Sequence, residues 1–158
     1  MMQDMNPKDV KGEFRELTVQ YFDGSKRTIL VNDVEVLYPE GRLIVSRTDK
    51  DGVITHVNKS FIEMSGYSEQ ELVGVPHHIL RHPDMPPAAF KDLWDTVQSG
   101  KRWQGYVKNL RKDGAFYWVY ATVVANIRNG EVTGYTSVRR KPSRKKVQEC
   151  AALYPTLF

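Results

Sequence analysis

The sequence predicts an α+β domain in which short helices and one longer helix cover one face of a five-stranded antiparallel sheet. Two observations lead to this prediction. Segments rich in β-branched and aromatic residues are separated by Asp-Gly and Asn-Gly turns, and a proline-interrupted helical region follows the second strand of the main domain. The chain has 158 residues, 41% of them hydrophobic and 27% charged, which is enough to form one such core.

The composition argues against several classes of protein. The longest apolar stretches, such as residues 117–127, are too short to cross a membrane, and residues 1–12 lack the apolar run of a signal peptide. The single cysteine, Cys150, excludes a disulfide framework, so we expect a cytoplasmic protein without direct membrane insertion. The net charge of +4 lies mainly in residues 108–112 and 139–146, which match no nucleic-acid-binding motif, so we expect no nucleic acid partner.

Two hairpins are expected in the first part of the chain. Residues 1–40 form an N-terminal extension with a turn at Asp23–Gly24, and nothing in the sequence assigns it a role. The main domain, residues 41–142, opens with a second turn at Asp51–Gly52. The expected strands are residues 14–20 and 27–31 in the first hairpin, and 43–47 and 53–57 in the second.

Helices are expected next. Residues 58–65 carry apolar side chains on one side, and a short helix then begins at Ser68, with Glu71 at the capping-box position. Prolines at positions 76, 83, 86 and 87 exclude one continuous helix through this region. Residues 88–98 have helical periodicity and are closed by Gly100, so they form the longer helix.

Three consecutive strands complete the sheet. They are expected at residues 103–111, 115–127 and 132–140, separated by Asp113–Gly114 and Asn129–Gly130. Residues 143–158 form a C-terminal helix or linker, because Ser143 is a good N-cap and apolar residues recur at helical spacing until Pro155.

These elements and residues together resemble a PAS domain, from Asp51–Gly52 through Asn58, Phe61, Ser65–Gly66–Tyr67 and Glu71–Leu72. A more specific signal is the run Arg81–His82–Pro83–Asp84–Met85–Pro86, followed by Trp94 and Trp103. It is similar to the PAS domains of the bacterial aerotaxis transducers, which carry FAD, and the similarity runs from about Gly41 to Phe158. The resemblance implies an FAD-binding sensor of redox, oxygen or energy state. It also implies that the chain is not an enzyme, and no catalytic motif is visible.

Several residues suit a flavin, which has a flat apolar ring, a polar edge and an anionic tail. Phe90 and Trp94 lie one helical turn apart and can supply a flat wall, although core packing would explain them equally well. Trp103 and Asn109 share one face of a strand, so Asn109 points where an apolar residue is expected. An unpaired buried amide costs about 1–3 kcal/mol, and the edge of a flavin would satisfy it. The alternative is a bond from Asn109 to local backbone near Asp113–Gly114.

The other candidate cofactor residues have weaker individual cases. Asn58 is explained more simply as a helix N-cap. Arg81 can bind a phosphate or ribose oxygen, while Asp84 either holds Arg81 or His82 or caps the following helix. His77 is expected to bond the flavin edge.

Two other classes of function stay open. His77 and His78 allow a haem-binding gas sensor, in which iron needs one well-aimed imidazole nitrogen. The third possibility is a cofactor-free PAS interaction module. Light sensing through a cysteinyl-flavin adduct is excluded, because residues 77–80 are His-His-Ile-Leu where that class needs a cysteine.

The outward face of the sheet is expected to transmit the signal. Its apolar patch needs a cover, which is the N-terminal hairpin, a second copy of the chain, or a signalling partner. The resemblance suggests a chemoreceptor or HAMP-type transducer, carried on another protein or on a longer receptor of which this sequence is a fragment. The patch consists of Tyr106, Leu110, Phe116, Trp118 and Tyr120.

Overall fold

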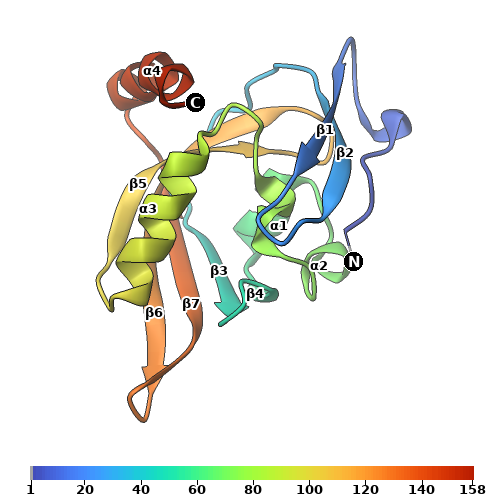
Figure 1. Cartoon of the computed structure of the whole chain (residues 1–158). Coiled ribbons are helices and arrows are strands. Elements are labelled where there is room, and N and C mark those ends of the chain that lie inside the picture. The colour runs from blue at the N-terminus through green and yellow to red at the C-terminus, as the bar shows by residue number, and fades with distance from the viewer. Residues whose placement is uncertain (1) are drawn as a thin grey trace.

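A computed structural model describes residues 2–158, and its main sheet has five antiparallel strands in the order β4-β3-β7-β6-β5 (Figure 1). The first and last strands of the domain, β3 and β7, lie side by side in the sheet, which ties the two ends of the domain together. This arrangement confirms the predicted α+β class and all five strands. Their bounds are β3 (Ile44–Asp49), β4 (Ile54–Val57), β5 (Trp103–Leu110), β6 (Phe116–Arg128) and β7 (Glu131–Arg140).

The expected N-terminal hairpin forms a separate two-stranded sheet of β1 (Arg15–Gln20) and β2 (Lys26–Val31). It is preceded by a short 3-10 helix, η1 (Pro7–Asp9). Gly24 closes the turn with φ at +84°, a conformation that costs glycine little and other residues more.

Three short helices and one longer helix cover the inner face of the sheet. Asn58 caps α1, its side chain accepting the amide of Phe61 at 3.0 Å, and the predicted capping box of Ser68 and Glu71 opens α2. Phe61, Leu72, Leu80 and Val97 are fully buried between these helices and the sheet. The helices are α1 (Lys59–Ser65), α2 (Glu69–Leu72), η2 (His77–Leu80) and α3 (Pro87–Gln98).

The C-terminal segment forms α4 (Arg144–Leu153), capped by Ser143 as expected, and then η3 (Tyr154–Leu157). None of the helices in the described part of the chain has the length and apolar character needed to cross a membrane.

The outward patch of the sheet is divided between two segments of the same chain. Leu110 is fully buried in a cluster with Met5 and Ile29, so the N-terminal region covers that corner. Elsewhere the C-terminal segment covers the patch: the Tyr154 hydroxyl donates to the carbonyl oxygen of Tyr106 at 2.6 Å, and its ring centroid lies 5.9 Å from that of Trp118. A cover by the C-terminal segment is not among the three predicted from the sequence.

Candidate ligand cavity

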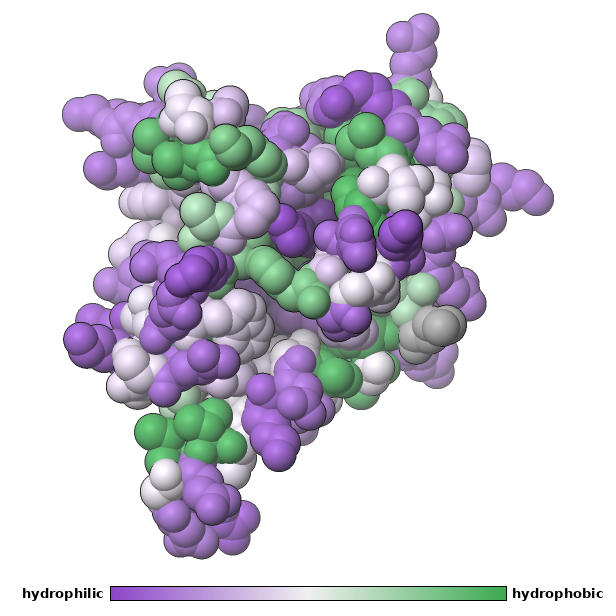
Figure 2. All heavy atoms as spheres, viewed as in Figure 1, coloured by the Kyte–Doolittle hydropathy of each residue, from purple (hydrophilic) through white to green (hydrophobic). Residues whose placement is uncertain are grey.

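A cavity of about 500 Å³ lies between the inner face of the sheet and the helices η2 and α3. This volume is in the range of small-molecule sites. The surface is hollowed between α3 and the β1–β2 hairpin, as Figure 2 shows from the side used in Figure 1. The cavity is lined from the sheet by Ser46, Thr48, Trp103, Val107, Asn109, Ala121, Val123, Tyr135, Ser137 and Arg139.

Sheet register explains why these side chains meet. In β5 and β6 the pairs Val107–Val119 and Gly105–Ala121 are directly opposite each other, and alternate residues share a face. In β3 and β7 the pair Ser46–Ser137 lies on the same inner face. The predicted parity of β5 is therefore the one that the structure has.

Aromatic side chains form one wall of the cavity. Trp94 of α3 packs edge-to-face on Tyr135, with ring centroids 5.1 Å apart, and Phe90 lies one turn before it. Trp103 folds back over Gly105 and donates its indole N–H to Asp92 at 2.9 Å. The wall thus has flat apolar surfaces. Tyr135 fixes the orientation of Trp94, and Asp92 fixes that of Trp103.

Asn109 lies on the sheet side of the cavity with only 4% of its surface exposed. Its Nδ2 has no hydrogen-bond partner among residues 2–158, and neither has the hydroxyl of Tyr117, its cross-strand partner. Burial raises the pKa of Tyr117 to about 12 against a smaller opposing effect of the Asn109 amide, so the phenol stays protonated. The two side chains therefore lie close together, but no hydrogen bond of standard geometry joins them. A buried amide donor without a partner is uncommon in proteins and indicates a ligand.

A second polar group lies where β3 and β7 meet η2. Nη2 of Arg139 donates to Oγ of Ser46 at 3.1 Å and lies 2.7 Å from Nε2 of His77. Burial, and then the neighbouring charge of Arg139, lowers the pKa of His77 to about 3. His77 is therefore neutral and accepts the hydrogen bond from Arg139 through Nε2.

The hairpin turn and η2 form the mouth of the cavity. The guanidinium of Arg81 lies 4.8 Å from the ring centre of Phe90 and 5.5 Å from that of Phe22, within cation–π range of both. Tyr21 stacks on His78, with centroids 3.9 Å apart. No role for the hairpin could be predicted from the sequence, and the structure places its tip at this opening.

The predicted site residues divide into two groups. The structure brings together His77, Arg81, Phe90, Trp94, Trp103 and Asn109 around the cavity. Asn58, His82 and Asp84 lie elsewhere. The amide of Asn58 is used by backbone groups of Leu43, Val45 and Phe61.

His82 and Asp84 lie at the edge of β5 and on its outward side. The backbone of Arg81 bridges to that of Asn109 at this edge, and the chain then turns outward. The buried ring of His82 packs edge-to-face on Phe116, and Asp84 binds Lys108 at 2.8 Å. The Arg81–Pro86 segment thus covers the sheet edge and links its two faces.

Arg139 lines the cavity and was not predicted as a site residue from the sequence. The period of two in β7 could have indicated it, because Tyr135 and Arg139 are four residues apart in that strand and therefore point to the same face of the sheet. The described residues contain no cluster of His, Cys, Asp or Glu suited to a metal ion, and Cys150 lies in α4, away from the cavity lining.

Comparison with known proteins places this chain in a family. Residues 54–139 match the model of the PAS fold. This chain belongs to the PAS fold family. It is 46% identical to the aerotaxis receptor of Escherichia coli strain K12 over 114 residues. The matched region is 72% of this chain and 22% of that receptor. The predicted resemblance to an aerotaxis-receptor PAS domain is confirmed, and the chain spans only about a fifth of that relative.

The chain is also similar to a second curated protein and, in its fold, to a solved structure. The chain is 33% identical over 104 residues to phototropin-2 of Oryza sativa subsp. japonica, a match that covers 65% of this chain and 11% of that protein. The LOV domain of the blue-light photoreceptor Aureochrome1 superposes with a TM-score of 0.61 at 24% identity, covering 67% of this chain and 89% of that one. This structural likeness supports the fold.

Proposed function

We propose that this chain is a flavin-binding PAS sensor, with FAD as its cofactor, that reports redox, oxygen or energy state through protein–protein contacts. The observation that carries the proposal is the buried Nδ2 of Asn109, which lacks a partner among residues 2–158 and lies at an aromatic cavity of about 500 Å³. A flavin ring offers carbonyl and imide groups to such an amide.

The residues around the cavity fit a flavin in three respects. Trp94, Phe90 and Trp103 supply flat apolar surface, and Asn109 supplies a hydrogen-bonding group for the polar edge. Arg81, at the mouth, supplies a positive charge for an anionic tail. When bound, a flavin supplies a ring whose redox state changes its protonation and hydrogen bonding.

The same residues suggest how the chain transmits a signal. Asn109 and Arg81 are joined through their backbones at the edge of β5, and the segment after Arg81 reaches Lys108 on the outward side. Asp84 and Lys108 also line a groove of about 230 Å³ beneath α4, together with Arg144, Val147 and Tyr154. A change in how Asn109 is hydrogen-bonded therefore has a short physical path to α4, where a state-dependent contact can bias conformation.

The output partner is proposed to be a chemoreceptor or HAMP-type transducer. The support is the sequence similarity to the aerotaxis receptor, together with the path that ends at α4. Nothing in the site calls for catalytic turnover, since the cavity groups bind and orient a ring.

Absorption spectroscopy and cofactor extraction test the proposal. We expect purified protein to show flavin bands and to release FAD, identified by chromatography, in a ratio close to one per chain. Asn109→Ala and Trp94→Ala should each retain less, whereas Gln104→Ala, which changes an exposed residue on the opposite face of β5, should retain the wild-type amount. A Soret band would indicate the haem alternative instead. Protein that is colourless and takes up neither group would indicate an interaction module.

A further inference from the structure

Arg139 carries a buried charge that no acidic residue balances. Only 3% of its surface is exposed, and among residues 2–158 it makes no ion pair with a carboxylate. Its Nη1 has no hydrogen-bond partner within the same residues. Buried arginines are usually paired, because an isolated charge is costly to remove from water.

The groups around Arg139 cannot neutralise it. Ser46 accepts a hydrogen bond without charge, and His77 accepts one through a neutral imidazole. Tyr117 stays protonated because burial raises its pKa, and the ring of Phe61, 5.2 Å from the guanidinium carbon, offers a cation–π contact. Tyr38 donates its hydroxyl to the backbone oxygen of Arg139, which fixes the strand at this point.

The position of Arg139 makes this charge relevant to a ligand. Arg139 lines the cavity from β7, opposite Ile44 of β3 and Ala121 of β6. Because Arg139 is buried, its charge acts over several ångströms with less screening than a charge on the surface. A ligand that carries negative charge near the inner face of β7 thus gains from Arg139, and a neutral ligand gains much less.

We propose that Arg139 forms an anion-binding subsite in the cavity and makes it hold reduced flavin more tightly than oxidised flavin. This inference rests on the proposed function. The oxidised ring is neutral, whereas two-electron reduction with uptake of one proton leaves it with one negative charge. The electrons come from a small-molecule reductant, for which dithionite serves in the test below.

Binding of both redox states tests the inference. Dissociation constants for FAD, oxidised and under anaerobic dithionite, are measured for the wild type, Arg139→Gln and Arg139→Lys. We expect Arg139→Gln to weaken binding of the reduced form at least tenfold more than binding of the oxidised form. For a two-electron couple a tenfold change equals about 30 mV, so the midpoint potential should fall by at least that amount. Arg139→Lys, which keeps the charge, should keep most of the preference.

Arg140→Gln is the matched control. It removes the same charge from the next residue of β7, which is exposed and lies on the opposite face, so the potential should stay at the wild-type value. An equal fall in both Gln variants, or an equal loss of both redox states in Arg139→Gln, overturns the anion subsite while leaving flavin binding intact. If the wild type binds neither state, the proposed function fails first.

A measurement without ligand gives a second, independent readout. Removing an uncompensated buried cation relieves a desolvation cost, so flavin-free Arg139→Gln should unfold at a temperature equal to or above that of the flavin-free wild type. A clearly lower unfolding temperature would show that Arg139 is a structural residue whose charge is already balanced, and would contradict the inference.

Discussion

Asp84 accepts a 2.8 Å hydrogen bond from Nζ of Lys108 on the outward side of β5, although Arg81, only three residues earlier, lines the cavity on the inward side. The segment that contains both residues therefore contacts both faces of one edge strand. Lys108 also lies 4.1 Å from the ring centre of Phe116, and Lys108, Phe116 and Asp84 all line the groove under α4. This relationship gives the domain a short link between ligand and output surface.

Asp84 is expected to act as a positioning residue. The carboxylate is half-exposed. Burial acts to raise its pKa, but the hydrogen bond from Lys108 and the nearby charges together hold the pKa below the usual value. Asp84→Asn should loosen the segment and reduce flavin retention about two- to five-fold, as expected for the loss of up to about 1 kcal/mol from an exposed ion pair. It should also raise hydrogen exchange in residues 81–86 and in α4.

Lys108→Met should reproduce both effects, while Lys101→Met, at an exposed position before β5, should produce neither. Flavin absorbance of the purified proteins measures retention, and hydrogen exchange followed by mass spectrometry measures the loosening of residues 81–86 and of α4. Unchanged exchange in α4 in both Asp84→Asn and Lys108→Met would disprove the proposed link.

Gly105 is expected to be needed for the position of Trp103. A Cβ at position 105 would lie 2.4 Å from Cη2 of the Trp103 indole, so an alanine must displace the ring and break its bond to Asp92. Gly105→Ala should lower the free energy of unfolding by about 1–3 kcal/mol and lower flavin retention. Both variants release the indole from its hydrogen bond, so both should shift the tryptophan fluorescence in the same direction. Asp92→Ala does so without adding a Cβ, and should therefore lower the free energy of unfolding less than Gly105→Ala does.

Acidification should destabilise the domain through its buried histidines. Burial lowers the pKa of His82 to about 4 and that of His77 to about 3, so below pH 6.5 the unfolded chain binds protons that the folded chain does not. Each histidine then makes the free energy of unfolding fall by about 1.4 kcal/mol per pH unit as the pH decreases toward its folded pKa.

His82→Asn isolates one of these contributions. Nδ1 of His82 accepts the amide of Asp84 at 3.0 Å, a bond that the Oδ1 of an asparagine can replace in an Asx turn. Between pH 6.5 and 4.5 the variant should lose about 2 kcal/mol less than the wild type in urea unfolding. If the free energy of unfolding falls equally with pH in the two proteins, His82 has the same pKa in the folded and unfolded states, and the prediction is wrong.

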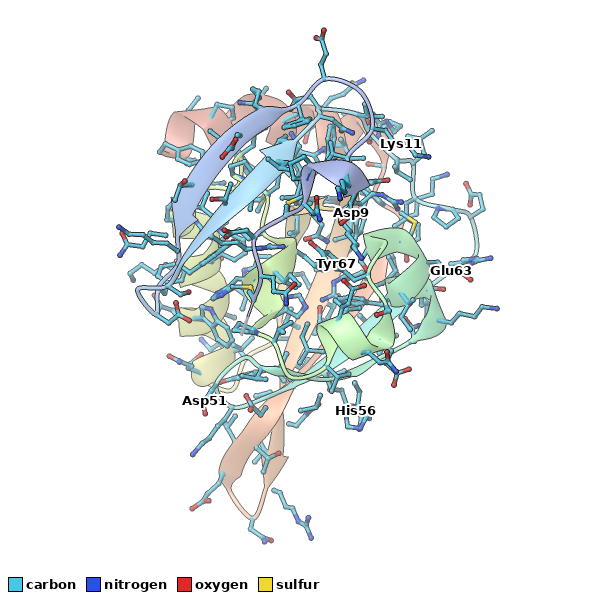
Figure 3. All side chains as sticks on the ribbon, turned by 90° about the vertical axis from the view of Figure 1, so that its right-hand side faces the viewer. Asp9, Lys11, Asp51, His56, Glu63 and Tyr67 are labelled. Atoms are coloured by element: carbon cyan, nitrogen blue, oxygen red, sulfur yellow. The ribbon has the colours of Figure 1, made fainter. Side chains whose placement is uncertain are left out.

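Arg27 is expected to hold the N-terminal hairpin at the mouth of the cavity. It is buried and donates to the carbonyl oxygen of Ile79 and to the hydroxyl of Tyr67, both at 3.0 Å. Figure 3 shows Tyr67 between the hairpin and the helices α1 and α2. Arg27→Leu should cost about 3 kcal/mol of hairpin docking, expose β1 and β2 to protease, and lower flavin retention.

Lys26→Leu is the control for Arg27→Leu, because Lys26 is exposed on the same strand. It should leave protease resistance and flavin retention at wild-type values. Equal flavin retention in Arg27→Leu and the wild type, despite cleavage of the hairpin, would show that the hairpin has no part in the site.

Local patterns predicted the elements of this fold and much of the cavity wall. The Asp-Gly and Asn-Gly turns, the Ser68 cap and the period of two in β5 each act over a few residues, so they can be read directly. The parity of β5 also placed Trp103 and Asn109 on one face.

The remaining features depend on contacts between residues far apart in the chain. The stacking of Tyr21 on His78 spans 57 positions and follows from no local pattern. For the same reason no local pattern predicted that Tyr154 of η3 packs on Trp118 or that Arg139 meets His77. The parity of β7 was a readable clue to Arg139, but nothing in it shows that the charge lacks a partner.

A titration of flavin-free protein with FAD, followed by fluorescence, tests whether the cavity binds a flavin ring through Asn109. We expect saturable binding at one FAD per chain, with Gln104→Ala binding as the wild type does. Asn109→Ala should weaken binding about five- to thirty-fold, because it loses about 1–2 kcal/mol of hydrogen bonding. Folded wild-type protein that does not bind FAD, or equal affinity in Asn109→Ala and the wild type, would contradict binding through Asn109.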